Sequence, residues 1–389
     1  MLEMSLKSKF IQHLENQYEG LKSKPLADLV SENLLCPFDI QLPPSVLKQG
    51  QDFISACFQL RQRKEYAEFM APKAQALGLK APGNYGIMMS YDFHLDETGT
   101  LKLIEINTNA AFLGLGYHMY LMRQKNLPVA NFKIENIREC ILHELRLFGS
   151  TPNLPSVVIT DEKPNEQRLF VEFLVYQELF KSWGWPTEIR DCRMALSDPK
   201  PDFIYNRYTD FYFENPLSGD LKKSFLAKSV CFSPHPYEYF LLADKERLTD
   251  WSSGFLETLP DFESQASVIK KHLLSSRPVT PENKELIWSE RKKLFFKPMQ
   301  EHGSKGSFKG GNISKTAFEN LIQKRTLAQQ YVVAPEVECP MTDGPQKFKY
   351  DLRFYAYQGQ LQLVLARLYQ GQTTNLRTPG GGFACVLFE

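Results

Sequence analysis

Several features that would place a chain in a common class are missing from this sequence. No run of about 18 apolar residues occurs, so no membrane-spanning helix is predicted. The 7 cysteines stand singly, without a Cys-x-x-Cys pair, which argues against a zinc ribbon and a disulfide framework. The first ten residues carry charges where a signal peptide needs an apolar core, so we expect a cytoplasmic protein.

A strong charge of one sign is missing as well. Lys plus Arg number 46 and Asp plus Glu 45, a net charge of +1, so neither nucleic acid nor a membrane surface is expected as a partner. The motifs of P-loop NTPases, dinucleotide-binding folds, His-Glu-x-x-His metalloproteases and Gly-x-Ser-x-Gly hydrolases are absent from the sequence. A zinc enzyme or a hydrolase with a serine nucleophile is therefore disfavoured.

What is present is a folded chain of 389 residues, 43% hydrophobic and 13% aromatic, long enough for two or three packed units. Apolar spacing predicts helices over 3–23 and 45–78, and a hairpin of two strands over 85–107. We expect three regions: a helical N-terminal region with the hairpin (1–150), an α/β unit with a small parallel sheet (151–240), and a region of alternating helices and strands (241–389). One of the strands expected in the last region lies at 331–333.

The hairpin carries three oxygen-bearing side chains. If it turns on Thr98 and Gly99, Asp92 lies opposite Glu105, and Asn107 shares the strand face of Glu105. Carboxylate and amide oxygens are the ligands that Mg²⁺ prefers. The alternative is a solvated polar face on an edge hairpin.

A second constellation joins a lysine to a glycine-rich loop. Lys297 ends an apolar strand, and the segment 303–311 contains four glycines whose backbone amides can approach an anion. Glu301, just before this loop, is a further candidate metal ligand. The alternative is a surface hairpin with no ligand.

A third constellation lies in the predicted strands near the C-terminus. Asp351 and Arg353 alternate on one strand and so share a face, and Arg367 follows further on. A guanidinium fixed on a sheet suits a phosphate or a carboxylate, and a cross-strand ion pair is the alternative.

Together these segments resemble the ATP-grasp superfamily of carboxylate–amine ligases, in the circularly permuted order of eukaryotic-type glutathione synthetase and glutathionylspermidine synthetase. Ile104-Glu-Ile-Asn-Thr-Asn109 is similar to the metal segment, and Phe296-Lys-Pro298 with the glycines to the phosphate loop. Ala243-Asp-Lys245 is similar to the first nucleotide lysine, and Gln329-Gln-Tyr-Val332 to the hinge strand that meets the adenine. The resemblance implies a fold that mixes α+β and α/β parts. It would be an ATP-grasp fold in circularly permuted order, with a small inserted α/β (Rossmann-like) substrate domain.

The resemblance also implies ATP and Mg²⁺ as cofactors and assigns residues to them. The implied metal ligands are Asp92, Glu105, Asn107 and Glu301. The implied nucleotide-binding residues are Lys245, Lys297, Gly303, Ser304, Lys305, Gly306, Gln330, Tyr331 and Val332. The implied catalytic arginines are Arg353, Arg367 and Arg207, the last as an anchor for a substrate carboxylate.

The implied activity is an ATP-dependent ligase that joins a small carboxylate to an amine through an acyl phosphate. The sequence departs from the glutathione synthetases at Ser90, where they present an arginine, and at Ala110 and Ala111, where hydroxyl side chains are common. The identities of the acid and the amine therefore stay open. The oligomeric state stays open as well, with a homodimer as one alternative. The alternatives are another ATP-grasp chemistry, such as phosphotransfer or modification of a protein side chain, and a nucleotide-binding protein without catalysis.

Overall fold

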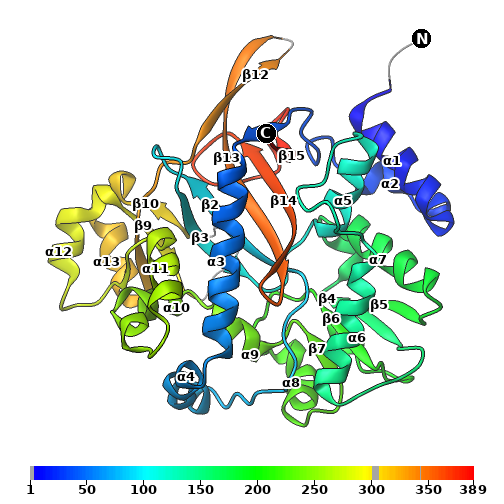
Figure 1. The fold of residues 1–389 in the computed structure, drawn as a ribbon, viewed down its shortest axis with the longest axis horizontal. Helices are drawn as coiled ribbons and strands as arrows, with labels where there is room; N and C mark the ends of the chain where they lie inside the picture. The colour runs from blue at the N-terminus through cyan, green and yellow to red at the C-terminus, as the bar shows by residue number, and fades with distance from the viewer. Residues whose placement is uncertain (1–3, 300–305, 342) are drawn as a thin grey trace.

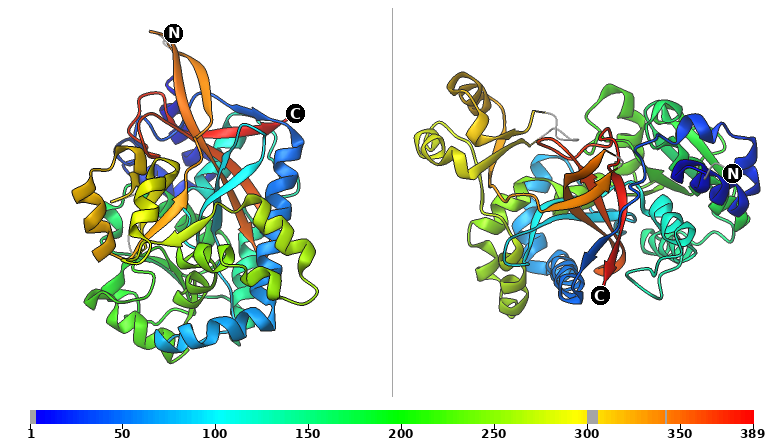
Figure 2. Two further views of the ribbon diagram at one scale, coloured as in Figure 1. Left: turned by 90° about the vertical axis from the view of Figure 1, so that its left-hand side faces the viewer. Right: turned by 90° about the horizontal axis from the view of Figure 1, so that it is seen from above.

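Three β-sheets organise the chain in the computed structural model, which describes residues 4–299, 306–341 and 343–389 (Figure 1). The central sheet has the order β1-β15-β14-β13-β2-β3, with β12 paired to part of β13. Its strands are β1 Ile40–Leu42, β2 Met89–Leu95, β3 Leu101–Asn107, β12 Glu336–Met341, β13 Gly344–Tyr357, β14 Gln360–Tyr369 and β15 Gly382–Phe388. Strands from the two ends of the chain thus share one sheet, and β12 with the start of β13 forms a ribbon that projects from the body (Figure 2).

Both faces of the central sheet are covered. Leu352 and Phe354 of β13 pack in one apolar cluster with the helix α3 (Pro44–Gln62), and Leu363 and Leu365 of β14 pack in another with α5 (Leu113–Met122). The apolar positions of α3 recur at helical spacing, which turns one stripe of this helix to the sheet. Because strand side chains alternate between the two faces of a sheet, the central sheet contributes to an apolar core on each of its faces.

Two further N-terminal helices, α1 Leu6–Gln17 and α4 Lys64–Ala76, lie within the predicted helical stretches. The short helix α2, Leu26–Leu29, lies between those stretches and was not predicted. The stretch predicted at 45–78 is interrupted at Arg63, whose backbone is extended (φ −68°, ψ 133°) between α3 and α4. Nowhere in the described residues is a helix both long and apolar enough to cross a membrane.

The second sheet is entirely parallel, in the order β5-β4-β6-β7. Its strands are β4 Val157–Asp161, β5 Thr187–Asp191, β6 Phe203–Asn206 and β7 Cys231–Ser233. The helices of this part of the chain are α6 Asn136–Phe148, α7 Phe170–Ser182 and α8 Gly219–Leu226. The small parallel sheet predicted within 151–240 is confirmed.

The third sheet has the order β10-β9-β11-β8 and an apolar cluster of its own. Its strands are β8 Ser276–Pro278, β9 Leu294–Pro298, β10 Phe308–Lys309 and β11 Thr326–Gln330, with the helices α12 Lys284–Glu290 and α13 Lys315–Gln323. The chain enters and leaves this sheet at neighbouring points, because the Gln330 amide donates to the Ser275 carbonyl at 2.8 Å. The helices before it are α9 Pro236–Glu238, α10 Glu246–Ser252 and α11 Glu263–His272.

The strand predicted at 331–333 is wrong. The strand here is β11, which pairs with β9 only up to Gln330 opposite Leu294. Beyond that pair β9 offers no partner, and residues 331–335 instead cross to the central sheet. In Figure 1 the third sheet, in yellow and orange, and the green parallel sheet lie on opposite sides of the central sheet.

Candidate functional site

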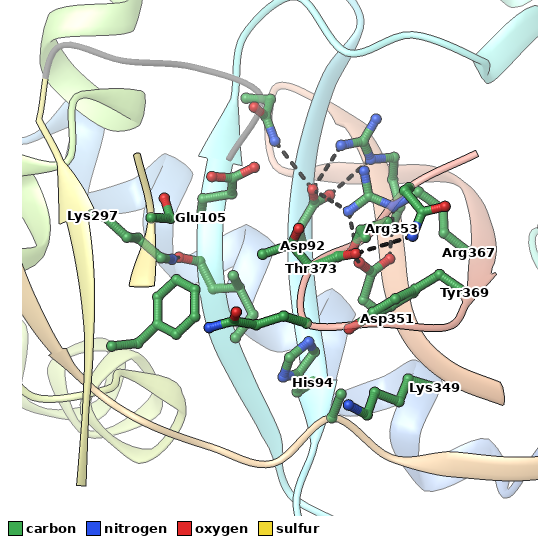
Figure 3. A pocket seen from close by; sticks show the side chains of 18 of the residues that line it. Asp92, His94, Glu105, Lys297, Lys349, Asp351, Arg353, Arg367, Tyr369 and Thr373 are labelled. Carbon is green, nitrogen blue, oxygen red and sulfur yellow. Dashed lines mark hydrogen bonds and ion pairs between the residues drawn. The ribbon is translucent and has the colours of Figure 1, made fainter. Parts of the chain in front are cut away.

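A cavity of about 440 Å³ lies between the central sheet and the third sheet (Figure 3). This volume is within the usual range of small-molecule sites. Most of the predicted site residues line it: Asp92, Glu105, Asn107, Lys245, Lys297, Gln330, Tyr331, Val332, Arg353 and Arg367. The fold thus brings together residues that are up to 275 positions apart in the chain, such as Asp92 and Arg367.

The remaining predicted residues are placed differently. Gly306 lies at the start of a described segment and does not line the cavity, although its neighbour Ser307 does. Arg207 lies outside the cavity lining as well. The predictions for Glu301, Gly303, Ser304 and Lys305 fall outside the described residues.

The predicted pairing of Asp92 with Glu105 is confirmed, and it depends on a β-bulge. Near the turn Leu95 pairs with Leu101 and Phe93 with Leu103, a register in which Asp92 would face Ile104. A register shift between Asp92 and Phe93 moves Glu105 opposite Asp92 instead. Ile104 and Glu105 both line the cavity, as two consecutive residues at a bulge can.

A row of charged side chains crosses four adjacent strands. Arg367 on β14 pairs with Asp351 on β13, and Arg353 on β13 pairs with Asp92 on β2. Glu105 on β3 ends the row. The predicted alternative for Asp351 and Arg353, a cross-strand ion pair, is therefore present, but inside a cavity rather than on a solvated face.

Asp92 is the centre of this row and is 1% exposed. Its carboxylate accepts two hydrogen bonds from Arg353, at 2.8 and 2.6 Å, and one from Arg367 at 2.8 Å. Ser90 and the Asn107 amide donate to it at 3.3 Å each. Burial raises the pKa of Asp92, but the attraction of the two arginines outweighs burial and holds this pKa at about 2.

Arg367 is shared between two carboxylates. Its Nε donates to Asp351 at 2.7 Å, while one of its terminal nitrogens bonds both Asp351 (3.0 Å) and Asp92 (2.8 Å). Thr374, from the segment that follows β14, donates its hydroxyl hydrogen to Asp351 as well. The arginines are therefore fixed in direction before any ligand arrives.

Lys297, on β9 of the third sheet, lies on the wall of the cavity opposite the row of charged residues. It is 6% exposed, and its Nζ donates to the Ile104 carbonyl at 2.8 Å. Burial lowers the pKa of this ammonium to about 8, against a partial opposing effect of Glu105, and Lys245 lowers it further. An anion bound beside Lys297 would favour its charged form.

The charges that line the cavity do not balance. Six cationic side chains, Arg168, Lys245, Lys297, Lys349, Arg353 and Arg367, face three anionic ones, Asp92, Glu105 and Asp351. The two aspartates are paired with the two arginines of the row, and the cationic side chains outnumber the anionic ones, so the cavity lining carries a net positive charge. The arrangement suits a small polyanion.

Arg207 is occupied by the chain itself. It is 8% exposed, and one terminal nitrogen donates to the carbonyls of Asn109 at 2.6 Å and Ala110 at 2.9 Å. This bonding ties the end of β6 to the turn that follows β3. The predicted role as a substrate anchor stays a prediction, and the contacts fit a residue that positions this turn.

Sequence reasoning missed several residues of the cavity. His94 follows Asp92 by two positions on β2, so the period of a strand was a signal for it. Gln329 lies next to the predicted hinge residues. Arg168, Lys349 and Tyr369 come from elements whose approach depends on the tertiary fold, and no signal in the sequence marks them.

The described residues contain no group of three His, Cys, Asp or Glu side chains placed to hold a metal ion. Glu105 and Asn107 nevertheless offer hard oxygen atoms at the cavity wall. A cation at this point would draw its other ligands from a bound substrate, as Mg²⁺ commonly does.

No protein-family model matches the chain, and no curated protein sequence matches it. Among solved structures, it is similar to the apo form of a glutathione synthetase-like effector from Globodera pallida, with a TM-score of 0.56 and 11% sequence identity. The alignment covers 91% of this chain and 90% of that one. The likeness shows a mixed α/β fold of the glutathione synthetase-like kind.

Proposed function

We propose that the cavity binds ATP with Mg²⁺ and that the protein is an ATP-dependent carboxylate–amine ligase of permuted ATP-grasp type. The observation that carries this proposal is the excess of fixed cations in a cavity whose wall also bears Glu105 and Asn107. The glutathione synthetase-like fold agrees with it. In chain order the oxygen ligands of β3 precede Lys297, as the permuted arrangement requires.

The side chains that line the cavity have different roles in this proposal. Lys297 and Lys245 neutralise the phosphates of the nucleotide, and Glu105 and Asn107 hold the cation. Bound Mg²⁺ would neutralise charge on the phosphoryl oxygens. Asp92 serves chiefly to fix Arg353 and Arg367, because its acceptor positions are already taken.

The reaction has two steps, and neither needs a protein nucleophile. A carboxylate oxygen of the acid attacks the γ-phosphorus, the bond to the β-phosphate oxygen breaks, and ADP leaves. An amine then attacks the acyl carbon, the carbon–oxygen bond to phosphate breaks, and the amine loses a proton. Arg353 and Arg367 supply fixed donors where negative charge accumulates.

Thermal unfolding with and without nucleotide tests the binding. At about 100 times its dissociation constant, Mg–ATP should add about 2.7 kcal/mol of stability. Glu105→Gln should lose the Mg²⁺-dependent part, and Glu97→Gln, at an exposed position in the turn of the same hairpin, should keep it. No stabilisation of the wild type at millimolar nucleotide would remove the proposal.

Turnover is tested separately with a panel of carboxylic acids and amines, scored by ADP release and by the product formed. Amide product identifies a ligase. Phosphorylated product without amide identifies phosphotransfer. Nucleotide binding without ADP release from any pair indicates a non-catalytic nucleotide-binding protein.

A further inference from the structure

The chain between β6 and α8 joins two apolar cores of the molecule. Tyr208 and Phe213 pack in the apolar cluster of the parallel sheet. Phe211 and Tyr212, which lie between them in the chain, pack instead against the cluster of α3 and the central sheet. This segment therefore bridges the α/β unit and the body of the protein.

Both ends of the segment are fixed by hydrogen bonds. At its start the Arg207 amide donates to the Thr160 carbonyl of β4 at 2.8 Å. At its end the Asp210 carboxylate accepts a hydrogen bond from the Glu214 amide at 2.9 Å. The side chain of Tyr212 is thus carried by a backbone that the α/β unit holds in place.

The two aromatic rings of the segment contact an unusual turn of the chain. Residues 239–243 form a single π-helical turn, and the amide of Asp244 donates to the Tyr239 carbonyl at 2.8 Å. Phe211 stacks on the ring of Tyr239, at 4.2 Å between centroids and 6°, and Tyr212 meets that ring edge-on at 5.2 Å and 82°. Such π turns are rare and occur frequently at functional sites.

Asp244 connects these contacts to Lys245. One oxygen of its carboxylate accepts the hydroxyl hydrogen of Tyr212, and the other accepts a hydrogen bond from the Glu246 amide at 2.9 Å. Its carbonyl accepts a further hydrogen bond from the Arg247 amide at 2.9 Å. The backbone of Lys245 lies between these bonded residues, so Asp244 restrains it.

This restraint matters because Lys245 lies near a second cation. Lys245 lines the cavity, and Tyr212 lies outside the lining. The pKa of Lys297 is lowered chiefly by burial and also by the charge of Lys245. Because like charges repel, conformations that separate the two ammonium groups are favoured in the absence of an anion, and a fixed backbone at Lys245 opposes them.

We propose that Tyr212 is a positioning residue of the nucleotide site: its hydroxyl holds Asp244, and Asp244 holds Lys245 toward the phosphates of ATP. This inference rests on the proposed function, and it adds that the α/β unit contributes to ATP affinity through Tyr212. If Tyr212 served the fold alone, its hydroxyl would affect stability but not the contribution of Lys245 to ATP binding.

A double-mutant cycle, measured by titration calorimetry with Mg–ATP, tests this link. Tyr212→Phe keeps the ring and removes the hydroxyl, and it should weaken ATP binding about five-fold, as the loss of a hydrogen bond to a charged group allows. In a chain that carries Lys245→Met, the same change should weaken ATP binding by less than about two-fold, because the lysine that it positions is gone. Tyr237→Phe, at a half-buried tyrosine of α9 outside the cavity lining, is the matched control and should leave the affinity unchanged.

A second cycle removes the residue between Tyr212 and Lys245. Asp244→Ala should weaken ATP binding at least as much as Tyr212→Phe does, and adding Tyr212→Phe to it should change the affinity by less than about two-fold. Thermal unfolding without nucleotide checks that each variant is folded. Unchanged ATP affinity in folded Tyr212→Phe, or losses that are independent of Lys245 and Asp244, would overturn the inference and leave the nucleotide site in place. Absence of ATP binding to the wild type would instead overturn the proposed function, and this inference with it.

Discussion

The salt bridge between Asp92 and Arg353 gives a quantitative prediction about stability. The two side chains are 1% and 9% exposed, and the pair is closed by two hydrogen bonds. Lowering the pKa of Asp92 from 3.8 to about 2 corresponds to about 2 kcal/mol in favour of the ionised carboxylate. Asp92→Asn also leaves Arg353 buried without an anion, and breaking such a pair costs about 3–5 kcal/mol. We expect Asp92→Asn to lower the free energy of unfolding by about 3 kcal/mol.

Urea unfolding at pH 7 measures this loss, and a double-mutant cycle isolates the pair. Arg353→Met combined with Asp92→Asn should cost little more than Asp92→Asn alone, because the unpaired cation is removed with its partner. Asp220→Asn, whose side chain is 77% exposed beside Lys223, is the control and should change stability by less than about 0.5 kcal/mol. Additive losses in the cycle would refute the reasoning.

The pH dependence gives an independent check. Because the pKa of Asp92 is lower in the folded state, its contribution is complete above about pH 4 and is lost as the pH falls toward about 2. The difference in stability between wild type and Asp92→Asn should therefore shrink over this window. A difference that stays constant down to about pH 2 would contradict the assigned cause.

Three further predictions concern other parts of the molecule. Burial lowers the pKa of Lys297 to about 8, so the affinity for ATP should fall between about pH 7 and about pH 10 as the ammonium deprotonates, which calorimetry measures. Lys297→Met should bind ATP weakly and without this pH dependence. Burial raises the pKa of Glu144 to about 7, so its contribution to stability is complete below about pH 4.5 and is lost as the pH rises through about 7. In urea unfolding from about pH 4 to about pH 8, Glu144→Gln should remove up to about 3 kcal/mol of the fall in stability that the wild type shows. A Cβ at Gly50 would stand 2.2 Å from Cε1 of Phe354, so Gly50→Ala should lower the free energy of unfolding by about 1–3 kcal/mol although alanine favours a helix. Gly219→Ala, whose Cβ would meet nothing within 4 Å, is the control and should not lower it; equal urea midpoints of Gly50→Ala and wild type would contradict the prediction.

Local patterns in the sequence predicted local structure well. The hairpin over 85–107 follows from two apolar runs and a turn, and α3 follows from the helical spacing of its apolar residues. The resemblance of short motifs gave the glutathione synthetase-like fold, which the structural comparison supports. The permuted ATP-grasp order and the region boundaries remain predictions.

What the sequence did not give depends on pairing between distant strands. The register of β13 against β2 decides that Arg353 faces Asp92, across 261 positions of the chain, and no local pattern specifies it. The bulge at Ile104, which moves Glu105 opposite Asp92, is likewise marked by no turn signal in the sequence. The end of β11 at Gln330 was missed because an aromatic residue and two valines follow it, which are typical of strands, yet the pairing of β11 with β9 stops at Gln330.

The attachment of the third sheet has a consequence for how a ligand enters and leaves. The chain passes into and out of this sheet at Ser275 and Gln330, which are hydrogen-bonded to each other, so the sheet is joined to the rest along one line. Across the cavity, Lys297 is fastened to the carbonyl of Ile104. A rotation of the sheet about that line would change the width of the cavity and would keep Phe295 and Gln329 in register with each other, because both belong to the sheet. Such a rotation would release the contact of Lys297 with Ile104 and would strain the ion pair of Arg325 with Glu246 and the hydrogen bond of Ser276 with Ser252, while the apolar cluster inside the sheet would stay intact.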